Sequence, residues 1–301
     1  MFIRQMTYLV ALAREKHFGR AAEACNVTQP TLSSGLKALE RELDMRLVVR
    51  GSRFMGLTPE GERVVDWAGQ ILSGYESLKQ DMEVFRGCLT GTLRLGVIPA
   101  AMPAIAELTT PFSSKHSHVV IEVHSMASTE IQRALEKFDL DVGLTYLENE
   151  PLQHVRKAAL YRERYLFVTR RDFRTENETA ITWKDAVASN LCLLNESMQH
   201  RRVLNNLARS LGFKLAPTVT TDSFLAVCSH VCSGKWSSII PHTFTYFLAG
   251  CENLVFLDLI EPVHTQSIGI VAADRDPLPP LTRAFMSFAT RLDLEPAFTQ
   301  A

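Results

Sequence analysis

The chain has 301 residues, of which 46% are hydrophobic and 22% are charged, so it can form two or three domains with hydrophobic cores. This composition excludes an extensively disordered protein. The net charge of -1 hides an asymmetry, because residues 1–58 hold 9 Lys and Arg against 5 Asp and Glu, a balance of +4, and the remainder therefore carries -5. A small basic head precedes a mildly acidic body, and such a head favours a nucleic-acid partner.

The N-terminal residues, the apolar runs and the cysteines indicate the cellular compartment. The first residues include a short apolar run, but polar Gln5 and Thr7 interrupt it and Arg14 closes it, so we expect no signal peptide. No run of about 18 apolar residues occurs, so no membrane-spanning segment is predicted. The six cysteines lie at irregular positions and form no disulfide framework, which favours a reducing cytoplasm.

The first 58 residues are predicted to form three short helices and a loop. Apolar residues recur at helical spacing over 3–13, and a second helix is expected over 20–25. Asn26 suits the turn that follows. Thr28 can cap the third helix, and Pro30 is tolerated in its first turn. The buried face of this helix is predicted to consist of Leu32, Leu36, Leu39 and Leu43.

After the third helix, apolar residues alternate around a loop that contains Arg50 and Arg53, a pattern typical of a two-stranded wing. Thr58, Pro59 and Glu60 then signal another helix start, with a capping hydroxyl, a proline and an acid against the helix dipole. Apolar residues follow at alternating spacings of 4 and 3: Val64, Ala68, Ile71, Tyr75, Leu78, Met82 and Phe85. This repeat predicts a helix that packs along a partner helix; the alternative is a helix that lies on its own domain.

Beyond residue 92 the pattern changes to alternating strands and helices. Strands are predicted over 92–98, 119–125, 140–146, 164–170, 191–194, 237–241, 254–259 and 267–273. Helices are predicted near 102–115, 128–137, 199–211, 222–233 and 280–292. Such alternation predicts open α/β sheets, and roughly 200 residues suggest two lobes.

The start of the third helix is the most distinctive feature of the head. A helix, a tight turn and a second helix allow the second helix to enter the major groove of DNA. The carboxamide of Gln29 can donate to and accept from adenine, and Lys37 can contact phosphate. The predicted DNA contacts are Thr28, Gln29, Pro30, Thr31, Ser33, Ser34, Lys37, Arg50 and Arg53. The alternative is that Thr28 only caps the helix and the serines face water.

These features resemble the LysR-type transcriptional regulators. The match runs through "AAEACNVTQPTLSSGLKALERELDMRLVVR", then "LTPEGE", and continues over essentially the whole chain. It implies an α/β multidomain protein with a winged helix-turn-helix DNA-binding domain, a linker helix that dimerises, and a two-lobed effector domain that resembles type 2 periplasmic-binding proteins. Their expected bounds are 1–58, 59–90 and 91–301, with lobe I over about 91–162 and 268–295 and lobe II over about 163–267. Two positions depart from the pattern: Gly19, where a capping Ser or Thr is common, and Val48, where Phe is usual.

The resemblance also implies partners and a ligand site. We expect a cytoplasmic homodimer or homotetramer that binds pseudo-palindromic double-stranded DNA and a small-molecule effector, with no cofactor and no metal. In open α/β sheets, ligands lie at the carboxyl ends of strands and at helix N-termini. The expected effector contacts are Pro99, Ala100, Ala101, Met102, Ser128, Thr129, Glu196, Ser197 and His200. In the family a Ser or Thr often stands at the positions of Pro99 and Ala100. The alternative for Ser128 is a plain helix cap.

A metal site, a redox sensor, a solute-binding protein and an enzyme are the other functions to consider for this sequence. On a helix Cys228 and Cys232 share a face while His230 points away, so the three are not expected to hold a metal, and we interpret the cysteines as buried small residues. Peroxide-sensing relatives of the family use a pair of cysteines, so a thiol-based redox regulator with the same DNA head is one alternative. A solute-binding protein is another. No catalytic motif occurs, so an enzyme is not predicted.

Overall fold

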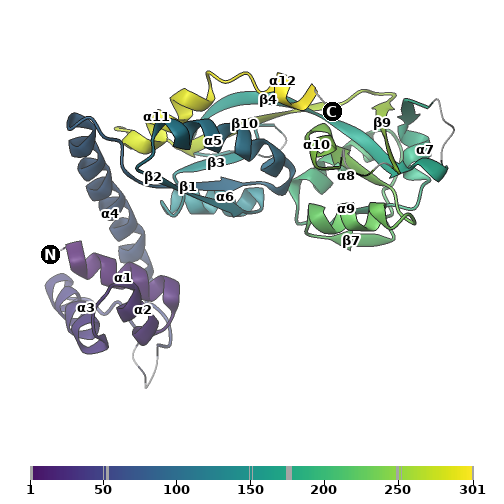
Figure 1. Cartoon of the computed structure of the whole chain (residues 1–301). Coiled ribbons are helices and arrows are strands. Elements are labelled where there is room, and N and C mark those ends of the chain that lie inside the picture. Colours follow the sequence, from purple (N-terminus) through teal and green to yellow (C-terminus); the bar gives the residue numbers. More distant parts are fainter. Residues whose placement is uncertain are drawn as a thin grey trace. The chain divides into compact units, whose positions relative to one another are not determined.

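The computed structural model describes residues 3–49, 51, 54–148, 150, 152–173, 178–248, 251 and 253–299 (Figure 1). The chain divides into two compact units, Met1–Cys88 and Leu89–Ala301. Each unit has a hydrophobic core of its own. Among the described helices, none combines the length and the apolar character that a membrane span requires.

The first unit contains four helices: α1 (Ile3–Glu15), α2 (Phe18–Ala24), α3 (Gln29–Leu43) and α4 (Pro59–Phe85). Leu9 and Leu12 of α1 are fully buried against Leu32 and Leu39 of α3, as the helical spacing predicts. Asn26 adopts a left-handed conformation, with φ of 53°, in the turn before α3. Pro59 begins α4, and the Oγ1 of Thr58 accepts a hydrogen bond from the N–H of Gly61 at 2.9 Å.

Helix α2 begins two residues earlier than its predicted start at residue 20. The reason is His17, whose Nδ1 accepts hydrogen bonds from the N–H groups of Gly19 at 3.1 Å and Arg20 at 3.3 Å. The cap that Gly19 lacks is thus provided by the imidazole ring two residues earlier. A Cβ at Gly19 would lie only 3.1 Å from the ring of His17, so the absence of a side chain there leaves room for this cap.

Among its described residues, the predicted wing is present as one antiparallel bridge between Val48 and Leu57, supported by the N–H of Val49 donating to the carbonyl of Gly56 at 3.0 Å. The buried carboxylate of Glu40 on α3 accepts from the N–H of Leu47 at 3.0 Å and from that of Val48 at 3.3 Å. The wing is therefore tied to the C-terminal half of α3. Arg50 and Arg53, the two predicted wing contacts, lie outside the described residues.

The second unit starts with lobe I. Strand β1 (Gly91–Val97) pairs in parallel with β2 (Val119–Ser125) and β3 (Val142–Tyr146), and β3 pairs antiparallel with β10 (Thr265–Ala273). The helices of this lobe are η1 (Pro99–Ala104), α5 (Ile105–Lys115), α6 (Ser128–Glu136), α11 (Pro280–Ala289) and α12 (Glu295–Thr299). The single helix predicted near 102–115 is therefore a 3-10 turn followed by α5.

Strand β4 (Val155–Arg170) is much longer than the predicted strand over 164–170. Residues 155–164 pair with β10, and residues 166–170 pair with β9 (Leu254–Ile260), so one strand runs through both lobes (Figure 1). The complete sheet has the order β2-β1-β3-β10-β4-β9-β5, with β8 also paired to β4. The first half of β4 was missed because charged residues such as Arg156 and Lys157 occupy its exposed positions and hide the apolar alternation.

Lobe II completes the second unit. Its other elements are η2 (Arg171–Phe173), β5 (Ala180–Thr182), α7 (Trp183–Val187), β6 (Cys192–Leu194), α8 (Gln199–Ser210), β7 (Val219–Thr221), α9 (Phe224–Cys232), β8 (Ser238–Pro241), η3 (His242–Phe244) and α10 (Thr245–Leu248). The elements absent from the prediction, β5, α7, β7, α10 and α12, are three to five residues long. Segments that short carry too few residues to establish a period.

Candidate functional site

The N-terminus of α3 presents a row of exposed polar side chains. Thr28 caps the helix: its Oγ1 accepts from the N–H of Thr31 at 3.4 Å and lies 2.9 Å from the hydroxyl of Thr31. Gln29, Pro30, Thr31, Ser34 and Lys37 are exposed, and Ser33 is half-buried. The leucines of α3 occupy the opposite, buried face. The cap and an outward-facing polar surface therefore coexist in one helix turn.

A basic hollow of about 620 Å³ continues this surface toward the C-terminus of α3. It is lined by Ser34, Lys37 and Arg41 of α3 and by Arg46, together with the acids Glu40 and Asp44 and with Met45. Sequence reasoning missed Arg41 and Arg46. The signal was available for Arg41, because Ser34, Lys37 and Arg41 follow helical spacings of 3 and 4 and so share one face.

The apolar repeat of α4 divides into two parts. Ala68 is buried and Val64 packs against the core of the first unit, so these two positions serve their own domain. Ile71, Tyr75, Leu78, Met82 and Phe85 are exposed, with Phe85 84% exposed. Trp67, which sequence reasoning did not include, is 57% exposed and lies one helical turn before Ile71. The first turns of α4 thus pack on their own domain, and the described residues of the second half leave a row of large apolar side chains uncovered. Packing of that row along a partner helix stays a prediction.

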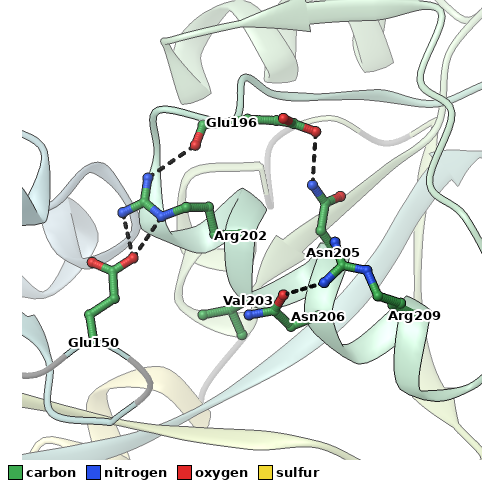
Figure 2. Close-up of a pocket in the computed structure, with 7 residues that line it drawn as sticks. All are labelled: Glu150, Glu196, Arg202, Val203, Asn205, Asn206 and Arg209. Atoms are coloured by element: carbon green, nitrogen blue, oxygen red, sulfur yellow. Dashed lines mark hydrogen bonds and ion pairs between the residues drawn. The ribbon is translucent and has the colours of Figure 1, made fainter.

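A polar network of Ser128, Glu150 and Arg202 joins the two lobes. Figure 2 shows two of its members, Glu150 and Arg202. The buried hydroxyl of Ser128, at the start of α6, donates to the carboxylate of Glu150 at 2.8 Å. Arg202 of α8 donates to the same carboxylate at 2.6 Å and to the Ser128 hydroxyl at 3.3 Å. Ser128 is not a plain cap, because the cap of α6 is Ala127, whose N–H donates to the carboxylate of Glu130 at 2.9 Å.

A polar hollow of about 310 Å³ lies beside this network. Its lining includes Glu196, whose side chain accepts from Asn205 at 3.0 Å, and the two cations Arg202 and Arg209 (Figure 2). Sequence reasoning predicted Glu196 and missed both arginines. Their spacing of seven residues along α8, with Asn205 between them, was the signal, since it corresponds to two helical turns on one face.

A second hollow between the lobes, of about 600 Å³, is mostly apolar; we call it the interlobe apolar cavity. Lobe I contributes Pro99, Met102, Pro103 and Ser125, and lobe II contributes Asp222, Ser223, Phe224, Leu225, Cys228, Phe244 and Leu248. The predicted contacts Pro99 and Met102 therefore line a cavity. Ala100 and Ala101 do not, because both are buried in the core of lobe I.

His200 lies behind the wall of this cavity. Its ring packs between those of Tyr165, at 5.5 Å between centroids, and Phe224, at 5.2 Å. Both ring nitrogens lack a hydrogen-bond partner among the described residues, and burial lowers the pKa of His200 to about 3. His200 is therefore neutral.

The remaining predicted contacts, Thr129 and Ser197, are exposed. Arg202 donates to the carbonyl of Glu196 at 3.0 Å, to the carbonyl of Ser197 and to the hydroxyl of Ser128. Three predicted effector residues therefore meet at Arg202, whereas Pro99 and Met102 line the interlobe apolar cavity.

The cysteines of lobe II are not all buried, contrary to the sequence interpretation. Cys228 is half-buried, and burial raises the pKa of its thiol to about 11. Cys232 is exposed, and its Sγ lies 3.6 Å from the Sγ of Cys251. This proximity was invisible in the sequence because 19 residues separate the two. Within the described ranges, no group of three His, Cys, Asp or Glu side chains is arranged to hold a metal ion.

Comparisons with known proteins cover both units. Residues 3–62 match the family described as "Bacterial regulatory helix-turn-helix protein, lysR family", and residues 86–293 match "LysR substrate binding domain". The chain is 28% identical over 279 residues to the "Hydrogen peroxide-inducible genes activator" of Dickeya chrysanthemi, a match that covers 92% of this chain and 91% of that protein.

Two solved structures are similar in fold. A full-length OxyR variant from Pseudomonas aeruginosa has a TM-score of 0.76 at 23% identity, and the match covers 96% of this chain and 94% of that one. Full-length CbnR complexed with its target DNA has a TM-score of 0.68 at 18% identity, with coverage of 97% and 99%. At these identities the likeness establishes the two-lobed architecture with a helix-turn-helix head.

Proposed function

The chain belongs to the LysR family and is a DNA-binding transcriptional regulator, and from that premise we propose that α3 reads its operator and that a small molecule bound between the lobes switches it. The observation that carries the first half is the exposed polar face at the N-terminus of α3, with Gln29 and Thr31 outward and Lys37 about two turns farther along the helix. The partial positive charge of the helix start favours phosphates at the same place.

The test separates base contacts from phosphate contacts. We expect Gln29→Ala to weaken binding to the selected operator by about 1–3 kcal/mol at the affected base pair, while affinity for random DNA stays unchanged. Lys37→Ala serves as the matched variant: it should weaken binding to all sequences alike and reduce the salt dependence. The operator is first obtained by selection from genomic fragments. Equal losses on operator and random DNA for Gln29→Ala would contradict base reading by its carboxamide.

The second half of the proposal is supported by the connection between the lobes. Strand β4 runs through both lobes, and the Ser128–Glu150–Arg202 network bridges them at their surface. A ligand that binds one arrangement of the lobes more tightly shifts the population toward it, and only that difference in affinity can drive the switch. The proposed outcome is altered placement of the DNA-reading heads and altered DNA bending.

The assembly and compartment belong to the same proposal. The exposed apolar side chains of α4 from Trp67 to Phe85 support a homodimer formed through this helix, which matches the two-fold symmetry of a pseudo-palindromic operator. Pairing of two dimers into a tetramer would allow two separate operator sites to be bridged. A regulator of transcription acts on the chromosome, so we infer a cytoplasmic location.

A thiol-based trigger is the second candidate, and the 3.6 Å separation of Cys232 and Cys251 favours it. Oxidation by one peroxide molecule would join the two sulfurs, release two waters and shorten the distance by about 1.5 Å. The pKa of the Cys232 thiol is raised, first by partial desolvation of the sulfur within this exposed residue and then by its contact with Cys251. This shift opposes the thiol-based trigger, because thiolates are the reactive form. Operator binding is measured before and after peroxide. The pair is excluded if both Cys232→Ser and Cys251→Ser keep the peroxide-induced change in operator binding. Cys88→Ser, at an exposed cysteine outside the pair, is the control.

A further inference from the structure

The interlobe apolar cavity restricts the chemistry of what it can bind. Its volume of about 600 Å³ lies in the range of small-molecule sites. Three of its described lining residues are polar, Ser125, Asp222 and Ser223, and the others are apolar. Burial of an apolar ligand surface against these side chains supplies the main favourable free energy of binding.

The charges at the cavity are unfavourable to an anion. Asp222 is the only charged residue among the described residues that line it. Helix α9 begins at Phe224, and its N-terminus carries about half a positive charge. The full negative charge of Asp222 stands two residues before that helix start and outweighs it. A carboxylate ligand would therefore enter a cavity with a net negative rim and no cationic side chain among its described residues.

One large apolar side chain at the rim is left uncovered. Leu225 follows buried Phe224 on α9. The rings of Phe224 and Phe244, which both line the cavity, have centroids 4.3 Å apart. Leu225 itself is 81% exposed. Leu225 and Asp222 line the same cavity, so a ligand that fills it lies against this side chain. Covering Leu225 removes apolar surface from water and adds to the affinity.

We propose that the interlobe apolar cavity binds an apolar amine, with its ring system against Phe224 and Met102 and its ammonium group at the carboxylate of Asp222. This assignment rests on the proposed function, because it names the class of effector that would switch the regulator. An uncharged alcohol of the same shape binds less tightly, and the matching carboxylate binds least tightly.

The test titrates the full-length protein by calorimetry at pH 7 with three probes of one shape: 2-naphthylmethylamine, 2-naphthylmethanol and 2-naphthoate. We expect the amine to bind about two- to fivefold more tightly than the alcohol, the range of an exposed charge pair, and the carboxylate to bind more weakly than both. Asp222→Asn should make amine and alcohol equal. Leu225→Asn should weaken all three several-fold. Val263→Asn is the matched control, because Val263 is 70% exposed and lies outside the cavity lining.

Three results would overturn the assignment: a carboxylate that binds as tightly as the amine, an amine affinity that Leu225→Asn leaves unchanged, or no binding of the amine at millimolar concentration. The titration uses no DNA, so it is separate from the operator selection. A chain that selects an operator but binds no amine refutes only the effector class. A chain that binds the amine but selects no operator refutes the DNA-binding role of α3.

Discussion

His17 and Glu163 show how single side chains take roles that their surroundings assign. The ring of His17 acts as a helix cap because Gly19 has no side chain to displace it. Glu163 is fully buried on β4, where Tyr146 donates to it at 2.6 Å and its second oxygen lacks a partner among the described residues. Burial raises the pKa of Glu163 to about 8. Each side chain leads to a measurable consequence.

Replacing the cap should loosen the start of α2. We expect His17→Ala to cost about 1 kcal/mol, because two N–H groups lose their acceptor. Hydrogen exchange of the segment 18–24 should become about fivefold faster, whereas His17→Asn, which restores an acceptor, should remain close to the original chain. Unchanged exchange in His17→Ala would show that water satisfies these groups equally well.

The buried carboxyl of Glu163 should give the second unit a pH-dependent stability. Its pKa is raised from 4.5 in the unfolded chain to about 8 in the folded one, so its stabilising proton is retained fully below pH 4.5 and lost as the pH rises toward 8. Relative to the original chain, Glu163→Gln should therefore gain stability between about pH 5 and pH 8, on the order of 3 kcal/mol. Urea unfolding at both pH values measures it, with exposed Glu107→Gln as control. A pH-independent difference would contradict a buried neutral carboxyl.

At the scale of elements, α4 has a packed part and an uncovered part along one helix. Its first turns pack on the head through Val64 and Ala68, and Gly61 approaches the wing so closely that a Cβ there would lie 2.0 Å from the carbonyl oxygen of Leu47. Beyond Ala68 the apolar row has no cover within the described residues of its unit. A uniform 3.5-residue repeat therefore extends over a packed part and an uncovered part, because the repeat specifies a helix face and not its partner.

The uncovered part of α4 should be what holds two chains together. We expect Leu78→Asp to convert a dimer into monomers in light scattering, because a carboxylate would be buried among apolar side chains without a cation. Ser73→Asp is the control, since Ser73 lies roughly 140° around the helix from Leu78. A dimer that persists in Leu78→Asp would exclude packing through this face.

At the scale of the second unit, two kinds of contact join the lobes. Strand β4 is continuous between them, because residues 155–164 pair with β10 of lobe I and residues 166–170 pair with β9 of lobe II, while the Ser128–Glu150–Arg202 network is a local side-chain contact. Glu150 and Arg202 are about 30% exposed, at 29% and 31%. In the switch that we propose, the continuous strand stays paired in both lobes, and the side-chain network is the contact that changes.

A double-mutant cycle measures this contact. We expect Glu150→Ala and Arg202→Ala to be non-additive in the unfolding free energy of the second unit, with a coupling of about 1 kcal/mol that falls in roughly 1 M salt. Ser128→Ala should reduce the coupling, because Ser128 hydrogen-bonds to both partners. Strict additivity would mean that the network does not hold the lobes together.

How much could be predicted from the sequence depends on the range of the interaction. Helix starts at Thr28 and Thr58, the exposed face of α3 and most long strands follow from local periodicity and capping, which neighbouring residues determine. The family followed from the same residues, which retained the pattern of the DNA-reading head. His17 was missed because an imidazole is an uncommon cap.

Only the tertiary structure brought together residues that are distant in sequence. Ser128 meets Glu150 and Arg202 across 22 and 74 residues, and Cys232 meets Cys251 across 19. It also separated Pro99 and Met102, which line a cavity, from Ala100 and Ala101, which are buried core. Sequence periodicity reports which face of an element is apolar, whereas the packing of two lobes decides which apolar residues border a cavity and which polar groups pair.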